Sequence, residues 1–270
     1  MAVSRETQDT PRHLFRIFTD QSNGTNSQYL LEPAVNTYRP FSDYTTDDDR
    51  QTTREQLTSA LNGNTAQKNP YIFTTRSFLF ALQHAISKRY GADHTNAHIL
   101  CIDTQTCHTP VGEGVRFTSA VTLMDELRVA PLKAHWTGEV IDYSDVYITS
   151  DTIVVGEGSY IVPFESLEDA GLYDLYPELE TIRHRSNPGL ERPVNDLREI
   201  WFEEEIDLTQ DQITLYAQLA STFEPGRGAS VNDTVPMHLL AWMLALKAQR
   251  PDGKSLKQWL ASFTRAQYAV

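Results

Sequence analysis

Cysteine is scarce in this chain of 270 residues, which holds only Cys101 and Cys107. Secreted domains that rely on disulfides carry more cysteines, so a disulfide scaffold is excluded. The most apolar run, at 239–246, is far shorter than the roughly 20 residues that a membrane-spanning helix needs. Residues 1–11 are polar and charged and contain no apolar stretch typical of a signal peptide. We therefore expect a soluble cytoplasmic or nuclear protein that does not cross a membrane.

Basic residues are also in deficit, because 23 Lys and Arg face 36 Asp and Glu and give a formal net charge of −13. A field of this sign repels phosphate backbones, which disfavours nucleic acid as a general partner. The sequence also lacks a Walker A loop, a dinucleotide fingerprint, a His-Glu-x-x-His motif and a Gly-x-Ser-x-Gly elbow. With 40% apolar and 22% charged residues, the chain can still bury a core.

Short apolar runs bounded by turn residues predict a fold of the α+β class with a small, split, mainly antiparallel β core. The expected strands lie at 13–18, 71–75, 97–103, 146–148, 152–155 and 160–162. The expected helices of this region lie at 53–61, 78–90, 118–128 and 166–172. The turn at 156–158 predicts a hairpin that joins the last two strands. Most of 19–70 is poor in aliphatic residues and is expected to be a long loop.

Composition changes beyond the α+β region, which we assign to 12–180. We expect a linker at 181–195 and an all-helical C-terminal region at 196–270, docked on the first region. The two charged parts of this tail are complementary, because 191–211 has two bases and eight acids (−6) whereas 226–270 has six bases and two acids (+4). Its expected helices lie at 197–206, 209–223, 236–249 and 255–263.

A cluster of histidine, cysteine and aspartate side chains stands between residues 94 and 108. Its members are His94, His98, Cys101, Asp103, Cys107 and His108. Zinc prefers Cys and His ligands, but the spacing does not match a zinc knuckle, and Cys101 lies within an apolar strand. We therefore expect no metal site, and a zinc-dependent hydrolase is the third and weakest interpretation.

An arginine stands inside the first apolar strand, where Leu14, Arg16 and Phe18 share one face. A buried arginine needs an anionic partner, and its planar fork suits a diphosphate. Thr74 and Thr75 follow at the junction of a strand and a helix, where hydroxyl groups can contact a sugar or an anion. The alternatives are a salt bridge or a solvated edge position for the arginine, and β-propensity with helix capping for the threonines.

Five short motifs recur in a recognisable order along 12–180. They are Leu14–Phe18, 73–85, Ile102-Asp103-Thr104, Tyr143-Ser144-Asp145-Val146-Tyr147 and 166–172. This order is similar to that of an uncharacterised fungal domain family, which in turn resembles the ADP-ribosyltransferase superfamily. The resemblance implies that Arg16 holds the diphosphate side of NAD and that Thr74 or Thr75 supports the nicotinamide ribose.

The resemblance also implies a catalytic glutamate on a later strand, at the position that Val146 occupies here. Valine cannot orient a ribose hydroxyl or stabilise a positively charged sugar. Glu139 and Glu157 are the nearest substitutes, and we select Glu157 as the catalytic candidate because flanking glycines permit close approach of a ligand. The alternative is that Glu157 is an ordinary exposed turn residue.

The leading functional hypothesis is an ADP-ribosyltransferase-like or NAD-cleaving protein with an unknown acceptor. NAD would be its substrate, with no resident cofactor. Cleavage of the nicotinamide–ribose bond builds positive charge on the sugar, so the site must offer a carboxylate. The main alternative is a catalytically degenerate interaction or binding module that keeps the fold and contacts an unknown protein partner.

Overall fold

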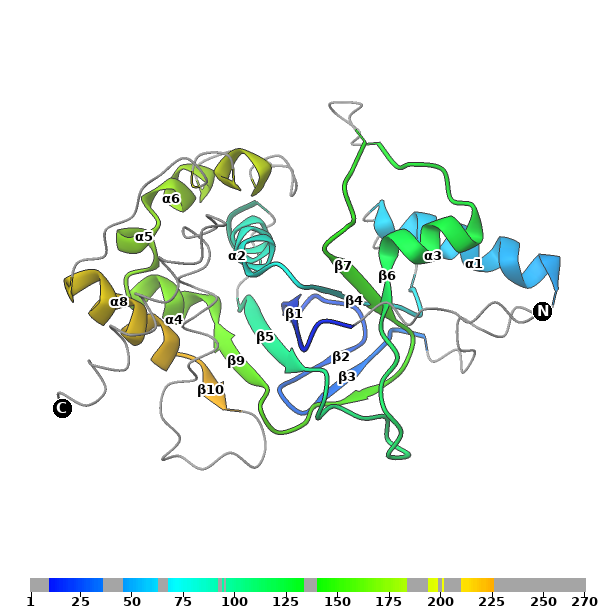
Figure 1. Ribbon diagram of the computed structural model, residues 1–270, viewed down its shortest axis with the longest axis horizontal. Helices are drawn as coiled ribbons and strands as arrows, with labels where there is room; N and C mark the ends of the chain where they lie inside the picture. The colour runs from blue at the N-terminus through cyan, green and yellow to red at the C-terminus, as the bar shows by residue number, and fades with distance from the viewer. Residues whose placement is uncertain are drawn as a thin grey trace, which may run out of the picture. The chain divides into compact units, whose positions relative to one another are not determined.

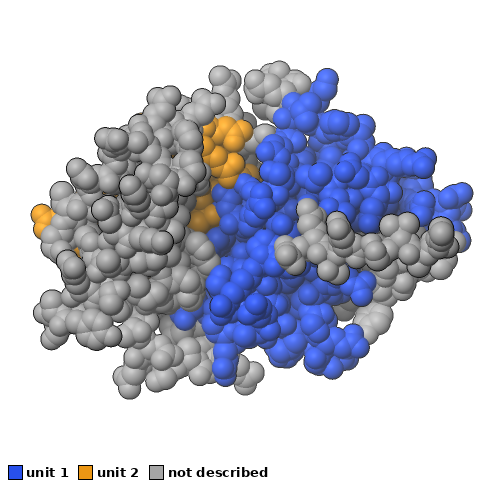
Figure 2. Space-filling view, in the orientation of Figure 1, with its two compact units in different colours: residues 1–77, 100–160, 225–228 blue, residues 78–99, 161–224, 229–270 orange. Residues whose placement is uncertain are grey.

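A computed structural model gives the architecture as α+β, with a mainly antiparallel sheet core and several helices, as expected. It describes residues 10–35, 46–62, 68–91, 94, 96–133, 140–183, 194–198, 201 and 210–225. Two compact units, coloured in Figure 2, are each assembled from separated segments of the chain. Unit 1 comprises 1–77, 100–160 and 225–228, and unit 2 comprises 78–99, 161–224 and 229–270.

The strands of the main sheet that lie wholly or largely in unit 1 run in the order β5-β1-β4-β7-β6 (Figure 1). These strands are β1 (His13–Phe18), β4 (Ile72–Thr75), β5 (His98–Asp103), β6 (Thr118–Ser119) and β7 (Val146–Thr149). β4 is antiparallel to both β1 and β7, and β6 is antiparallel to β7. β4 and β7 match the expected apolar runs closely, because β7 is buried along its length and β4 is buried at every residue except Phe73.

A second sheet of unit 1 consists of β2 (Thr25–Asn26), β3 (Leu30–Glu32) and β8 (Ile153–Val154). The expected hairpin between 152–155 and 160–162 is wrong, because β8 pairs with β3 instead. Leu31 and Ile153 face each other across this pair and are both fully buried. Strands of two or three residues show no alternation that the sequence could reveal, which is why β2 and β3 were expected to be loop.

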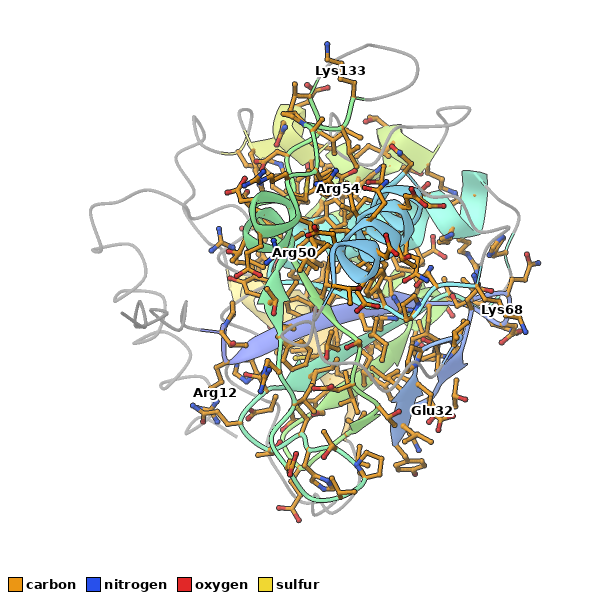
Figure 3. The ribbon with its side chains drawn as sticks, turned by 90° about the vertical axis from the view of Figure 1, so that its right-hand side faces the viewer. Arg12, Glu32, Arg50, Arg54, Lys68 and Lys133 are labelled. Atoms are coloured by element: carbon orange, nitrogen blue, oxygen red, sulfur yellow. The ribbon has the colours of Figure 1, made fainter. Side chains whose placement is uncertain are left out.

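Two helices of unit 1 pack together, α1 (Asp47–Leu61) and α3 (Ala120–Leu127). α1 begins six residues earlier than expected, because the Thr46 hydroxyl accepts a hydrogen bond from the Asp49 N–H at 3.1 Å. Arg54 of α1, labelled in Figure 3, donates from Nε to the Leu127 carbonyl at the end of α3, at 2.7 Å. Leu57 and Leu123 join Val146 and Ile148 of β7 in one apolar cluster, which fixes both helices against the sheet.

Helices dominate the described part of unit 2. They are α2 (Phe78–Ile86), the π-helix η1 (Ser87–Gly91), α4 (Phe164–Asp169), α5 (Leu172–Leu175), α6 (Pro177–Arg183) and α8 (Gln210–Ser221), with the strands β9 (Tyr160–Pro163) and β10 (Glu224–Pro225). The expected helix at 78–90 changes from α to π geometry at Ser87. α6 was not expected, and it extends into the segment assigned as a linker.

The C-terminal expectations are tested only in part. α8 lies where a helix was expected at 209–223, and residues 194–198 are helical. The expected helices at 236–249 and 255–263 lie outside the described residues, so the docking of the tail stays a prediction. Within the described ranges, no helix is both long enough and apolar enough to cross a membrane.

Candidate functional site

The structure places Arg16 beside Thr74. Because Phe15 is opposite Thr75 in the antiparallel β1–β4 pair, the register puts Arg16 opposite Thr74. Residues opposite each other on neighbouring strands project from the same face of a sheet. Thr74 is buried, and its hydroxyl donates to the Tyr147 carbonyl of β7 at 3.1 Å. Arg16 and Thr74 therefore lie on one face of the sheet, while the role of each in ligand binding stays a prediction.

The Arg16 guanidinium is held by neutral oxygen atoms. Its Nε and Nη2 donate to Asn26 Oδ1 at 3.3 and 3.1 Å, and its Nη1 donates to the Phe73 carbonyl at 3.0 Å. The Asn26 amide is oriented by its own donor, because Nδ2 bonds to the Asn23 carbonyl at 3.0 Å. A guanidinium has five N–H groups. Three are used, and two have no recorded acceptor within the described ranges.

Burial leaves Arg16 as a poorly compensated cation. Desolvation lowers the pKa of Arg16 to about 10, so the residue is still charged at neutral pH. No carboxylate lies within ion-pair distance of it among the described residues. Burying a charge is costly unless it is paired, so an anionic group brought to the two remaining N–H groups would be strongly favoured.

Thr75 and Val146 lie on the opposite face of the sheet from Arg16. They are partners in the β4–β7 register, one residue out of phase with Thr74 and Tyr147. The Thr75 hydroxyl accepts the Ser77 N–H at 3.1 Å and so shapes the turn that follows β4. Val146 packs in the apolar cluster beneath α1 and α3. A carboxylate at position 146 would enter that cluster and would not face Arg16, so position 146 and Thr75 do not share a cleft with this arginine.

Glu157 lies in the exposed turn after β8. The Thr106 hydroxyl donates to its main-chain carbonyl. A Cβ placed on Gly156 would stand 2.2 Å from the Thr106 carbonyl oxygen, and Gly158 has a φ of +80°. The glycines therefore admit the neighbouring turn of the same chain, whereas we had expected them to admit a ligand. No recorded contact within the described chain joins Glu157 to Arg16, and Glu139 lies outside the described residues.

Asp103, at the end of β5, is a buried polar residue that the sequence analysis named in the cluster at 94–108 and in the motif at 102–104. Its Oδ2 pairs with Arg12 Nη2 at 3.2 Å, and its Oδ1 accepts the Gln105 N–H at 3.0 Å. Its own N–H donates to Ser159 Oγ at 3.1 Å. These contacts tie the end of β5 to Arg12, which immediately precedes β1, and to the turn after β8, which gives Asp103 a structural role.

The cysteines near Asp103 are buried and free. Burial raises the pKa of Cys107 to about 11, so its thiol is a poor nucleophile and a poor metal ligand at neutral pH. Among the side chains that the structure describes, no group of three or more His, Cys, Asp and Glu residues is arranged to hold a metal ion.

Residues 9–150 match the family described as Domain of unknown function (DUF7587), and this segment is more than half of the chain. The protein therefore belongs to that family. The matched segment contains Arg16, Thr74, Thr75 and Val146 but ends before Glu157. No curated protein and no solved structure matches the chain.

Proposed function

We propose that this DUF7587 family member is a non-catalytic binding module that holds an anionic, phosphate-bearing ligand at Arg16. The observation that carries the proposal is the contact set of this side chain, a half-buried guanidinium whose hydrogen-bond partners among the described residues are all neutral oxygens. A planar fork with two N–H groups that have no acceptor in the described ranges matches the spacing of phosphate oxygens. NAD is the candidate ligand, because the sequence resembles the ADP-ribosyltransferase superfamily through the motif around Arg16.

The arrangement supports binding more than cleavage. Breaking the nicotinamide–ribose bond requires a carboxylate next to the developing positive charge. Val146 is apolar and belongs to the cluster on the other face of the sheet, and Glu157 contacts the turn around Thr106. An NAD-cleaving enzyme that uses Glu157 is the alternative function.

Calorimetric titration of the protein with NAD tests the binding proposal. We expect measurable affinity for wild type and about a tenfold loss for Arg16→Lys, which keeps the charge but loses the fork. Arg76→Lys is the matched control, because Arg76 already pairs with Asp145 at 2.7 Å and lies half exposed. An affinity for NAD that is unchanged in Arg16→Lys, or no affinity in wild type, would refute the proposal.

Release of free nicotinamide separates the two functions. The binding module is expected to release none above the rate of NAD in buffer. Turnover that is lost in Glu157→Gln would favour the enzyme and identify its carboxylate. Turnover that survives Glu157→Gln would favour the enzyme with a different carboxylate.

A further inference from the structure

A second charged cluster, in unit 2, is built around the carboxylate of Glu168 on α4. The hydroxyls of Tyr90 and Tyr173 both donate to Glu168 Oε1, at 2.5 and 2.8 Å. Arg89 forms an ion pair with the other oxygen, which lies 2.9 Å from its Nε, and Arg89 Nη2 lies 3.3 Å from Glu165. The Arg89 Nε–H donates to the Tyr90 hydroxyl at 3.3 Å. The π geometry of η1 brings Arg89 and Tyr90, which are adjacent in sequence, onto the same carboxylate. Both phenol rings are therefore fixed at their hydroxyl ends.

Arg183, the last residue of α6, lies over these two rings. Its guanidinium carbon is 4.5 Å from the Tyr90 ring centroid and 5.8 Å from the Tyr173 ring centroid. Both distances are within the range in which a cation is attracted to the face of an aromatic ring. In the part of the chain that the structure describes, no carboxylate lies within ion-pair distance of Arg183. Aromatic faces therefore provide its recorded contacts.

The rings are well suited to hold a cation. A phenol that donates its proton to a carboxylate carries more electron density on its face, and the Glu168 carboxylate, which Arg89 neutralises in part, lies behind both rings. The Arg89 guanidinium carbon also lies 5.6 Å from the Tyr90 ring centroid, so Tyr173 is the ring that Arg183 does not share with Arg89. Burial, together with the hydrogen bonds to Glu168, raises the pKa of Tyr90 and of Tyr173, so both stay protonated and keep donating. The two rings and Arg183 are only half-buried, so an outside group can reach them.

We propose that Tyr90, Tyr173 and Glu168 form a receptor site for a guanidinium group, which Arg183 fills in the chain alone and an arginine side chain of a basic partner displaces. The site already accommodates a guanidinium, whose flat, weakly hydrated shape stacks better than an ammonium group. The net charge of −13 attracts basic partners over longer distances. Because Arg183 ends α6, its side chain can leave the rings without unwinding the preceding turns. This site is independent of the Arg16 proposal.

The test is a titration with N-acetyl-arginine amide, followed through the ring-proton NMR signals of Tyr90 and Tyr173. Arg183→Gln empties the site while keeping a polar side chain there. We expect this variant to bind the probe about tenfold or more tightly than wild type. Arg116→Gln, which removes an exposed arginine of unit 1, should behave as wild type. The neutral analogue N-acetyl-citrulline amide should not bind either variant.

Two outcomes would overturn the proposal. One is a folded Arg183→Gln variant that binds the arginine probe no better than wild type, and the other is equal binding of the citrulline probe. Circular dichroism checks that Arg183→Gln folds. If it does not fold, Arg183→Lys replaces it, and we expect its affinity for the arginine probe to lie between those of wild type and a chain with an empty site. Adding Tyr173→Leu to either variant should abolish the gain, and a gain that survives would also refute the assignment.

Discussion

The Arg16 side chain both connects strands of unit 1 and carries the proposed binding site. It joins β1 to the second sheet through Asn26 and to β4 through the Phe73 carbonyl, yet no recorded partner in the described chain neutralises it. A purely structural residue would more commonly be met by a carboxylate, as Arg76 is by Asp145. The cost of burying its charge is therefore the physical basis of the proposed anion site.

At the residue scale, Gly156→Ala should destabilise the protein by about 2–4 kcal/mol. A Cβ there would stand 2.2 Å from the Thr106 carbonyl oxygen, so the two turns must separate. Gly114→Ala is the matched control, because a Cβ at Gly114 meets nothing within 4 Å. Urea unfolding measures both, and equal stability of the two variants would contradict the close contact between the turns.

Glu157→Gln should change the free energy of unfolding by less than about 0.5 kcal/mol, since Glu157 is an exposed turn residue whose recorded contact is through its main chain. Its affinity for NAD should equal that of wild type. Thermal unfolding and calorimetry provide the measurements, and a large loss of NAD affinity would place Glu157 at the ligand after all.

At the element scale, the sequence pattern did not predict the first turn of α1. Its first turn reads as a polar loop, but Thr46 caps it and Asp47, Asp48 and Asp49 complement the positive end of the helix dipole. We expect Thr46→Ala to lower the free energy of unfolding by about 1 kcal/mol and Thr46→Ser to be nearly neutral. Chemical denaturation of both variants checks this, and an equal loss in both would mean that the cap hydrogen bond is not the cause.

Local pattern predicted β1, β4, β5 and β7 well, because each is a buried run with β-branched or aromatic residues and clear polar ends. It could not predict which strands pair. The hairpin expected at 152–162 failed because pairing depends on contacts distant in sequence, such as Leu31 with Ile153.

Prediction of the candidate site also required strand pairing, which the local sequence pattern does not give. Alternation shows that Thr74 and Thr75 lie on opposite faces, but only the register with β1 shows that Thr74 is the one beside Arg16. It likewise took the β4–β7 register to put Val146 on the far face. A motif read along the chain could not make either distinction.

At the scale of the whole molecule, each compact unit is built from segments that are distant in sequence. Buried titratable groups in these units make the free energy of unfolding of the protein depend on pH. Burial raises the pKa of Cys107 to about 11 and that of Tyr216 to about 12, and raises the pKa of Cys101 well above its ordinary value. The folded state therefore keeps protons that the unfolded state releases from about pH 9 upward.

The free energy of unfolding should therefore fall as pH rises above 9. Below pH 8 these cysteine and tyrosine groups should make no pH-dependent contribution to it. Each such group contributes at most about 1.4 kcal/mol per pH unit between its unfolded and folded pKa values. Cys107→Ala should reduce the slope between pH 9 and 11 by up to that amount. Urea unfolding at a series of pH values tests this, and a stability that rises over this range would contradict the sign.

The most direct test of the central claim observes Arg16 itself. The Nε–H signal of Arg16 can be assigned in a ¹⁵N-labelled sample by its absence in Arg16→Lys, and then followed during titration with NAD. We predict a saturable shift of this signal, while the corresponding signal of Arg76 stays in place. Saturable NAD binding that leaves the Arg16 signal unmoved, or no binding at all, would contradict the account.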